Sequence, residues 1–420
     1  MKASISKSEI KGRVVAPSSK SYTIRGVMAA ALANGESEII RPLGSDDTEA
    51  AQGVLSEVGV HIRQDKGTWR VTGGNFHKPE KGLFCRESAT TLRFMTAICS
   101  LIPGECRLTS APSLSQRPIE PLIQALKQLG VDCHQDEGGA VVVRGSRLRG
   151  GTAELPGNIS SQYVSALLFI SPFAEEGMNI KLTTSLESQP FVQMTIECLA
   201  KFGIKVDASR DMREFKIVKQ SYRPAKYRVE GDWSSASYLL GLGALCGEVE
   251  VENLNPASLQ GDKAILDFLK EMGASVTAGE NSVTVRKSKL QAIKADLNEC
   301  IDLVPTMAVL AAAAEGTSEF TGIERARLKE SDRPSAIAEG LMKMGIKVVE
   351  ERDRLTITGS PVKGAVIDTR GDHRIAMAFS LLGLSGGGNV INDAECVSKT
   401  YPEFWEVLKK VGGKVKIDGE

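Results

Sequence analysis

The chain repeats one local pattern six times, and this repetition constrains the fold more than any other feature. In each copy a helical stretch ends in Leu-x-x-x-Gly, and a short run that favours a β-strand follows. A glycine directly after an apolar-periodic helix is typical of a C-cap, where a residue in left-handed conformation reverses the chain. Self-similarity at a fixed period predicts six copies of one structural unit. The glycines, spaced 67 to 73 residues apart, are Gly59, Gly130, Gly203, Gly273, Gly345 and Gly412.

A second helix recurs in every unit, and it is richer in small and apolar residues than the first. A helix this apolar is expected inside a domain, whereas the more amphipathic Leu-x-x-x-Gly helices are expected partly outside. Strand-like stretches surround both helices, so each unit is predicted to run strand, helix, strand, helix, strand, strand. The six apolar helices are expected at Tyr22–Ala33, Thr90–Leu101, Ser161–Pro172, Ser234–Leu245, Asp302–Ala314 and Asp372–Leu384.

The ends of the chain predict how the units divide into domains. The sixth unit stops after Lys414–Ile417 without its last strand, whereas residues 2–16 hold spare strand-like stretches before the first repeat helix. The simplest way to complete the sixth unit is for these N-terminal strands to join the sheets of the C-terminal half. At 420 residues the chain also exceeds what one hydrophobic core usually organises. We therefore predict an α/β protein of two domains with three units each, residues 1–18 with 231–420 and residues 19–230.

Composition excludes several classes of partner. Lys+Arg and Asp+Glu balance at 52 each, so the net charge gives no reason to expect nucleic acid or an anionic membrane. No stretch approaches the roughly 18 uninterrupted apolar residues of a membrane-spanning helix, and no signal-peptide pattern is present. The eight cysteines and four histidines lack the spacing of metal ligands. We expect a cytoplasmic monomer that uses no metal or other cofactor and acts on small molecules.

The start of the first apolar helix combines features that favour an anion. Pro17 and two serines precede the helix, and Lys20, Ser21 and Arg25 lie on or just before its first turns. Free backbone N–H groups and the helix dipole already attract negative charge at such a position. Taken alone, the stretch is equally typical of an ordinary capped surface helix. The remaining units decide between the two interpretations, because several of them repeat the arrangement.

Cationic side chains drawn from both halves of the chain lie near the starts of the repeat helices. Arginine forks suit carboxylate and phosphate groups, and lysine adds a point charge, so substrates with several negative charges are expected. Asp302 and Glu330 are acids among these cations, and this placement suits proton transfer. Asp232 and Asp372 are interpreted as helix caps or salt-bridge partners. The seven cations are Lys20, Arg25, Arg117, Lys329, Arg333, Arg374 and Lys399.

In their order and separation, these motifs resemble the 5-enolpyruvylshikimate-3-phosphate (EPSP) synthase family over essentially the whole chain. The resemblance implies a barrel-like fold of two inverse α/β domains, each with three βαβαββ units, and a reaction in the cleft between them. The motifs are Ser19-Lys20-Ser21 with Arg25, Gln116-Arg117-Pro118-Ile119, Ser160-Ser161-Gln162, Glu230-Gly231-Asp232 with Ser234-Ser235-Ala236-Ser237-Tyr238, Lys329-Glu330-Ser331-Asp332-Arg333, Asp372-His373-Arg374 and Ser398-Lys399-Thr400.

The resemblance also implies the reaction and the residues that perform it. The family transfers the enolpyruvyl group of phosphoenolpyruvate to the 5-hydroxyl of shikimate 3-phosphate and releases phosphate. Asp302 would take the hydroxyl proton, while Glu330 and Lys20 would serve the enol carbon and the leaving phosphate. Shikimate 3-phosphate would contact Lys20, Ser21, Arg25, Ser160, Ser161, Gln162, Ser188, Asp302 and Lys329. Phosphoenolpyruvate would contact Lys20, Ala89, Arg117, Gln162, Arg333, Arg374 and Lys399.

The sequence departs from the family pattern at three positions. Ala89 stands where the family commonly has glycine, so its methyl group is expected to weaken binding of the inhibitor glyphosate while phosphoenolpyruvate is still used. Phe191 replaces a frequent tyrosine and removes a hydroxyl near the substrate. Arg325 replaces a frequent asparagine, which puts a phosphate contact at that position in question.

Two alternative functions are compatible with the same repeats. One is the related cell-wall enzyme that transfers enolpyruvyl to UDP-N-acetylglucosamine, whose family usually has Lys-Asn at the first motif and a catalytic loop cysteine. Here Ser21 follows Lys20, and residues 107–117 contain no cysteine. The other is a non-catalytic anion-binding protein, against which the acids Asp302 and Glu330 argue.

Overall fold

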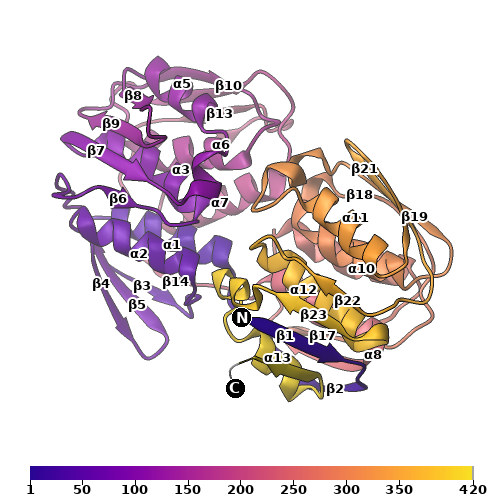
Figure 1. The fold of residues 1–420 in the computed structure, drawn as a ribbon. Coiled ribbons are helices and arrows are strands. Elements are labelled where there is room, and N and C mark those ends of the chain that lie inside the picture. Colours follow the sequence, from indigo (N-terminus) through magenta and orange to yellow (C-terminus); the bar gives the residue numbers. More distant parts are fainter. Residues whose placement is uncertain (419–420) are drawn as a thin grey trace. The chain divides into compact units, whose positions relative to one another are not determined.

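A computed structural model describes residues 1–418, and contacts within the chain divide it into two compact units (Figure 1). The first unit consists of Met1–Pro17 and Glu230–Glu420, and the second of Ser18–Val229. Each unit contains three four-stranded sheets and its own hydrophobic core. Among the described residues, no helix is long and apolar enough to span a membrane.

All six sheets have the same order of strands. Counted within a repeat, the order is first, second, fourth, third, with the first pair parallel and the other neighbours antiparallel. The parallel pair needs a crossover connection, and in four of the sheets the apolar helix of the repeat supplies it. In the other two, Lys226–Arg228 pairs with Gly35–Ile40, and Ile10–Val15 pairs with Gly247–Glu252, so the paired strands come from distant parts of the chain. The sheets of the second unit are β14 (Lys226–Arg228), β3 (Gly35–Ile40), β5 (Thr68–Gly73) and β4 (His61–Asp65); β6 (Leu83–Phe84), β7 (Gly104–Thr109), β9 (Val141–Gly145) and β8 (Asp132–Gln135); β10 (Gly151–Leu155), β11 (Met178–Leu182), β13 (Glu214–Ile217) and β12 (Asp207–Ala208).

Strands from the N-terminus complete two sheets of the first unit. β2 pairs in parallel with β15, with Ile10 opposite Gly247, and β1 lies between β23 and β24 as the fourth strand of the sixth repeat. The sheets of this unit are β2 (Ile10–Val15), β15 (Gly247–Glu252), β17 (Ser282–Arg286) and β16 (Ser275–Ala278); β18 (Lys294–Asp296), β19 (Thr317–Thr321), β21 (Arg354–Thr358) and β20 (Lys347–Glu351); β22 (Ala365–Ile367), β23 (Asn389–Asn392), β1 (Lys2–Ser6) and β24 (Lys414–Ile417).

The apolar helices form the centre of each unit, as their composition predicts. In α12 every residue is buried, and in α1 only the first two residues are not. The central helices are α1 (Lys20–Leu32), α3 (Ala89–Ile98), α6 (Ser161–Ile170), α8 (Trp233–Cys246), α10 (Val304–Ala312) and α12 (His373–Leu382). The outer helices are α2 (Asp46–Glu57), α5 (Glu120–Gln128), α7 (Gln189–Lys201), α9 (Ile265–Glu271), α11 (Arg333–Lys343) and α13 (Phe404–Lys410), and α4 (Pro112–Ser115) is a single turn.

The predicted C-cap glycines are confirmed. Gly59 has φ 98° and Gly273 has φ 84°, and the other four repeat glycines also have positive φ. At Gly59 a β-carbon would approach the carbonyl oxygen of Asn75 to 2.8 Å, so this position excludes side chains by space as well as by conformation. Each of these glycines ends an outer helix and turns the chain into the next strand.

The fifth central helix begins later than predicted. Asp302, expected as its first residue, lies instead in a 3-10 segment, η4 (Asn298–Leu303), and α10 starts at Val304. Pro305 has no backbone N–H, so it cannot continue a helical hydrogen-bond ladder from the preceding turn. Cys300, with φ −133°, interrupts the helical geometry of the segment. Asp302 is therefore held on a tight turn ahead of the helix.

Candidate active site

The first unit gathers the predicted acids and cations around one buried guanidinium. Arg333, the first residue of α11, donates from Nη1 to Asp302 at 2.7 Å and from Nη2 to Glu330 at 2.6 Å. Its Nε donates to Asp372 at 2.9 Å. Burial opposes the charge of Arg333, but the three carboxylates outweigh that effect and raise its pKa. Arg333 is 1% exposed, so this cluster is a fixed element of the unit.

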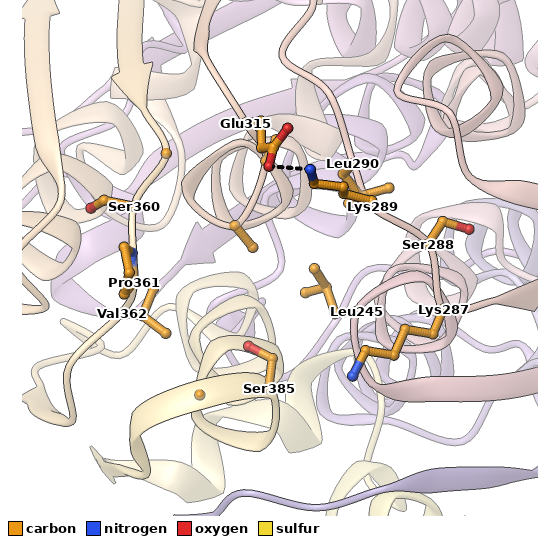
Figure 2. A pocket seen from close by; sticks show the side chains of 14 residues that line it. Leu245, Lys287, Ser288, Lys289, Leu290, Glu315, Ser360, Pro361, Val362 and Ser385 are labelled. Atoms are coloured by element: carbon orange, nitrogen blue, oxygen red, sulfur yellow. Dashed lines mark ion pairs between the residues drawn. The ribbon is translucent and has the colours of Figure 1, made fainter.

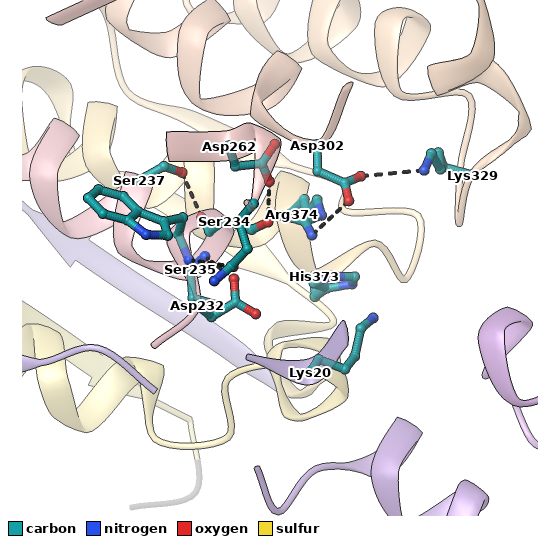
Figure 3. Close-up of polar contacts among 12 residues, drawn as sticks. Lys20, Asp232, Ser234, Ser235, Ser237, Asp262, Asp302, Lys329, His373 and Arg374 are labelled. Carbon is teal, nitrogen blue, oxygen red and sulfur yellow. Dashed lines mark hydrogen bonds and ion pairs between the residues drawn. The ribbon is translucent and has the colours of Figure 1, made fainter. Parts of the chain in front are cut away.

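Asp302 lies among three cations, and Figure 3 shows two of them, Arg374 and Lys329, beside it. Besides Arg333, its carboxylate contacts Nη2 of Arg374 at 3.2 Å and Nζ of Lys329 at 3.6 Å. Burial alone would raise the pKa of this carboxyl group, but Arg374, Lys329 and Arg333 hold it well below its usual range. Asp302 is therefore an ionised carboxylate whose charge is more than balanced by its neighbours.

Two lysines, Lys329 and Lys399, complete the cationic cluster of the first unit. Lys329 lies between η5 (Glu324–Leu328) and α11, and burial lowers its pKa to about 8. Lys399, at the end of η7 (Ala394–Lys399), lies 3.8 Å from the carboxylate of Glu330. Both lysines face the same acids as the arginines, so one compact region holds four positive side chains.

The predicted capping roles of two aspartates are confirmed. Asp372 is the N-cap of α12, where it accepts from the backbone N–H of Arg374 at 2.9 Å. Asp232 caps α8 by accepting from the N–H of Ser235 at 3.0 Å. The carboxylate of Asp372 also forms an ion pair with Arg333, so the same side chain caps α12 and holds the guanidinium group.

In the second unit, Lys20 stands at the start of the first central helix. Ser19 is the N-cap of α1 and accepts from the N–H of Tyr22 at 3.4 Å. The ammonium group of Lys20 contacts Asp47, in the first turn of α2, at 2.8 Å. Sequence reasoning missed Asp47, because acids in a first helical turn are common as partners of the helix dipole. This ion pair fixes the direction of a long, otherwise flexible side chain.

Arg25 is held by the protein on three of its guanidinium nitrogens. Nε donates to Thr195 at 2.8 Å, Nη2 to the carbonyl of Phe191 at 2.9 Å, and Nη1 to the carbonyl of Ser21 at 3.1 Å. Burial lowers its pKa to about 10. These bonds tie α1 to α7, so Arg25 anchors the turn of α1 that carries Ser21.

Arg93 connects three of the segments that the sequence singled out. Its Nη1 donates to Oε1 of Gln162 at 2.6 Å, and Nη2 donates to the carbonyl of Pro118 at 3.1 Å. The amide nitrogen of Gln162 in turn donates to Thr90 at 3.0 Å. Arg93 was not among the predicted site residues. The available signal was its position, since it is the one charged residue within the apolar stretch Ala89–Ile98.

Arg117 has unused hydrogen-bonding capacity. Its Nε and Nη2 atoms are buried, and within residues 1–418 neither has a hydrogen-bond partner. A buried donor without a partner costs roughly 1–3 kcal/mol, and more when the group is charged. Such an arginine is typical of a site that receives an anion.

The remaining predicted residues lie at helix starts of the second unit. Ser160 is the N-cap of α6 and accepts from the N–H of Gln162 at 3.3 Å, and the buried Ser161 is the first residue of that helix. Ser188 is the N-cap of α7, with left-handed φ of 54°. Ala89 is the first residue of α3. The three helices α3, α6 and α7 thus present these residues at their N-terminal ends.

A separate cavity lies at the opposite ends of the central helices in the first unit (Figure 2). Its volume is about 860 Å³, and Leu245, Ala313 and Ser385 from the ends of α8, α10 and α12 line it. Lys289 and Glu315 form an ion pair on its wall. The lining residues include none of the predicted site residues, and two of these, Asp302 and Arg374, lie at the beginnings of α10 and α12.

Comparison with known proteins shows similarity over the full chain. The pattern of the family described as EPSP synthase (3-phosphoshikimate 1-carboxyvinyltransferase) matches residues 5–408. A 3-phosphoshikimate 1-carboxyvinyltransferase of Dehalococcoides mccartyi is 51% identical over 420 residues, covering all of both chains. One of Methanosarcina mazei is 43% identical and covers 99% of each chain.

Solved structures agree with these relatives. The structure of EPSP synthase from Acinetobacter baumannii matches with a TM-score of 0.83 and 27% identity, covering 99% of this chain and 100% of that one. This likeness confirms the predicted α/β fold. Sequence and structure lead to the same conclusion: the chain belongs to the EPSP synthase family.

Proposed function

We propose that this protein transfers the enolpyruvyl group of phosphoenolpyruvate to the 5-hydroxyl of shikimate 3-phosphate, releasing phosphate. It would thus act as a 3-phosphoshikimate 1-carboxyvinyltransferase in the shikimate pathway of aromatic amino acid biosynthesis. Full-length similarity to enzymes of that name supports the proposal. The observation that carries it is the cluster in which Asp302 lies among Arg333, Arg374 and Lys329.

The negative charges of the two substrates are complementary to the positive charges of the residues assigned to bind them. Each substrate carries a carboxylate and a phosphate, and arginine and lysine are the side chains that bind such groups. The unpartnered nitrogens of Arg117 are suited to one of these anions. We assign phosphoenolpyruvate to Lys20, Ala89, Arg117, Gln162, Arg333, Arg374 and Lys399. We assign shikimate 3-phosphate to Lys20, Ser21, Arg25, Ser160, Ser161, Gln162, Ser188, Asp302 and Lys329.

The surroundings of Asp302 suggest how it becomes a base. In the ligand-free protein three cations hold its pKa low, which makes it a poor proton acceptor. Bound anions would share those cations, and their negative charge would raise the pKa of Asp302. Asp302 then accepts the proton of the 5-hydroxyl group while the oxygen of that hydroxyl group attacks the substituted enol carbon of phosphoenolpyruvate. Asp302 thus becomes an effective general base when both substrates are bound.

The second acidic residue, Glu330, acts on the methylene carbon of the enol double bond. Glu330 takes up a proton when the bound anions share its cations, and it delivers this proton to the methylene carbon, which gives a tetrahedral intermediate. The later return of a proton from that carbon to Glu330 expels phosphate. Lys20 stabilises the charge that develops on the leaving phosphate. Arg333 contacts both acids, at 2.7 Å and 2.6 Å, so one guanidinium sets their separation.

We propose that the two units are the domains 1–18 with 231–420 and 19–230. The assigned ligands of phosphoenolpyruvate come from both units, so both are required for turnover. Both substrates are small soluble anions, which supports a cytoplasmic enzyme, and we propose that it works as a monomer. Sedimentation at the concentration of the activity assay tests the monomer.

A phosphate-release assay tests the proposed function. The wild-type protein is expected to release phosphate from phosphoenolpyruvate only when shikimate 3-phosphate is added, and not with UDP-N-acetylglucosamine. Asp302→Asn should abolish release, whereas Asp267→Asn, on the exposed side of α9, should not change it. Release with UDP-N-acetylglucosamine alone would assign the chain to the other transferase. Binding of both anions without turnover in the wild type would make it an anion-binding protein.

A further inference from the structure

A further buried acid lies beside the cluster around Asp302. Asp262, on the 3-10 turn η3 (Gly261–Ala264), is 3% exposed and is not among the residues assigned above. The hydroxyl group of Ser234, in the first turn of α8, donates a hydrogen bond to its Oδ2 (Figure 3). The turn is fixed by Gln260, whose side chain accepts from the N–H of Trp233 at 3.0 Å.

The groups that face Asp262 come from each element packed around it. Asp302 and the Cys300 thiol come from η4, Arg374 from α12, and Asp232 from the cap of α8. Two buried carboxylates near one arginine cannot both ionise cheaply. Asp302 has two further cations and keeps its charge, so the proton remains on Asp262. Burial, followed by the charge of Asp302, raises the pKa of Asp262 to about 7.

We propose that Asp262 is a positioning residue for the proposed reaction: as a neutral acid bound to Ser234, it fixes the first turn of α8 against α12, the helix that carries Arg374, and leaves that arginine free to bind the substrate carboxylate. This inference rests on the proposed function. Loss of the proton from Asp262 would place another negative charge beside Arg374. That charge would compete with phosphoenolpyruvate for the guanidinium group and weaken binding of this substrate.

Kinetics of two substitutions test the proposal. Asp262→Asn preserves the shape and hydrogen bonding of the neutral acid but cannot ionise, and Asp262→Ala removes both. KM for phosphoenolpyruvate and kcat are measured at saturating shikimate 3-phosphate between about pH 6 and about pH 8.5. From low to high pH, the KM of the wild type should rise by about fivefold relative to that of Asp262→Asn. Lys329 ionises in both proteins, so the ratio of the two KM values reports the ionisation of Asp262 alone.

The alanine variant separates positioning from a general loss of structure. Asp262→Ala should raise KM across the whole pH range by about tenfold and change kcat less, and Asp262→Asn should restore the low KM. Asp267→Asn, on the neighbouring helix α9, is the matched control and should follow the wild type. Wild-type and Asp262→Asn KM profiles that superimpose would overturn the proposal, even if Asp262→Ala fails to fold.

A measurement without substrates distinguishes failure of this inference from failure of the proposed function. Folded protein keeps the proton on Asp262 to about pH 7, whereas the unfolded chain releases it near pH 4. The melting temperature of the wild type should therefore fall relative to that of Asp262→Asn as the pH rises through this window. A constant difference would refute the neutral acid. If the wild type lacks turnover, the proposed function fails, while this comparison still decides the state of Asp262.

Discussion

Replacing Arg333 by glutamine should destabilise the first unit in a pH-dependent manner. The substitution removes one positive charge from three carboxylates at 2.6–2.9 Å. Asp302 keeps Arg374 and Lys329, and Glu330 keeps Lys399. Within residues 1–418, by contrast, no other lysine or arginine is paired with Asp372, which is fully buried. Breaking a buried ion pair costs about 3–5 kcal/mol.

The direction of the pH dependence follows from where the proton resides. In the wild type the pKa of Asp302 is depressed, so its contribution is present above about pH 4 and is lost only on acidification. In Arg333→Gln one of the three cations that depress this pKa is gone, so Asp302 contributes less stability above about pH 4. The difference between the two proteins is expected to be largest above about pH 4 and to shrink on further acidification.

Native-state hydrogen exchange measured on peptides from α10 and α12 reports the free energy of the first unit separately from the second. Arg352→Gln is the control, because Arg352 pairs with Glu324 at an exposed position. It should cost less than about 1 kcal/mol at every pH. A destabilisation by Arg333→Gln below about 1 kcal/mol at pH 7, or one that does not shrink as the pH falls below about 4, would refute the electrostatic reasoning.

Three further predictions concern activity. Glu330→Gln should lower kcat by about 10²–10⁴-fold while calorimetry shows that both substrates still bind, and near-normal turnover would show that another group moves the proton. Ala89→Gly should strengthen inhibition by glyphosate, measured as its inhibition constant against phosphoenolpyruvate, and an unchanged constant would exclude the methyl group as the cause. Affinity for shikimate 3-phosphate should fall as the pH rises through about 8, where Lys329 loses its charge. Lys329→Arg should remove this fall in titrations across that range, and a fall that persists would assign it to another group.

The repeat could be predicted because it depends on local chemistry. A glycine after an apolar helix requires little tertiary context, and Gly59 and Gly273 have the expected left-handed backbone. Arg333 and Arg374 were identified for a related reason, since each lies within two residues of a helix cap that the sequence itself marks.

The partners of these residues could not be predicted in the same way. Arg93 meets Gln162 across 69 positions of sequence, and Asp262 meets Ser234 across 28. Such contacts depend on how central helices and turns of different repeats pack, and no local pattern records that. Asp302 was identified as an acid, but its position on a tight turn ahead of α10 follows from the interruption at Cys300.

The order in which the strands are synthesised has a consequence for folding of the nascent chain. The second unit is complete once Val229 has left the ribosome, because β14 is its last strand. β1 must wait for β23 and β24, the final strands to be made. At about 5–20 residues per second, translation of the chain between β1 and these partners takes roughly 20–80 s, during which the edges of β1 stay unpaired. Chaperone dependence during biosynthesis should therefore concentrate on the earliest residues of the chain.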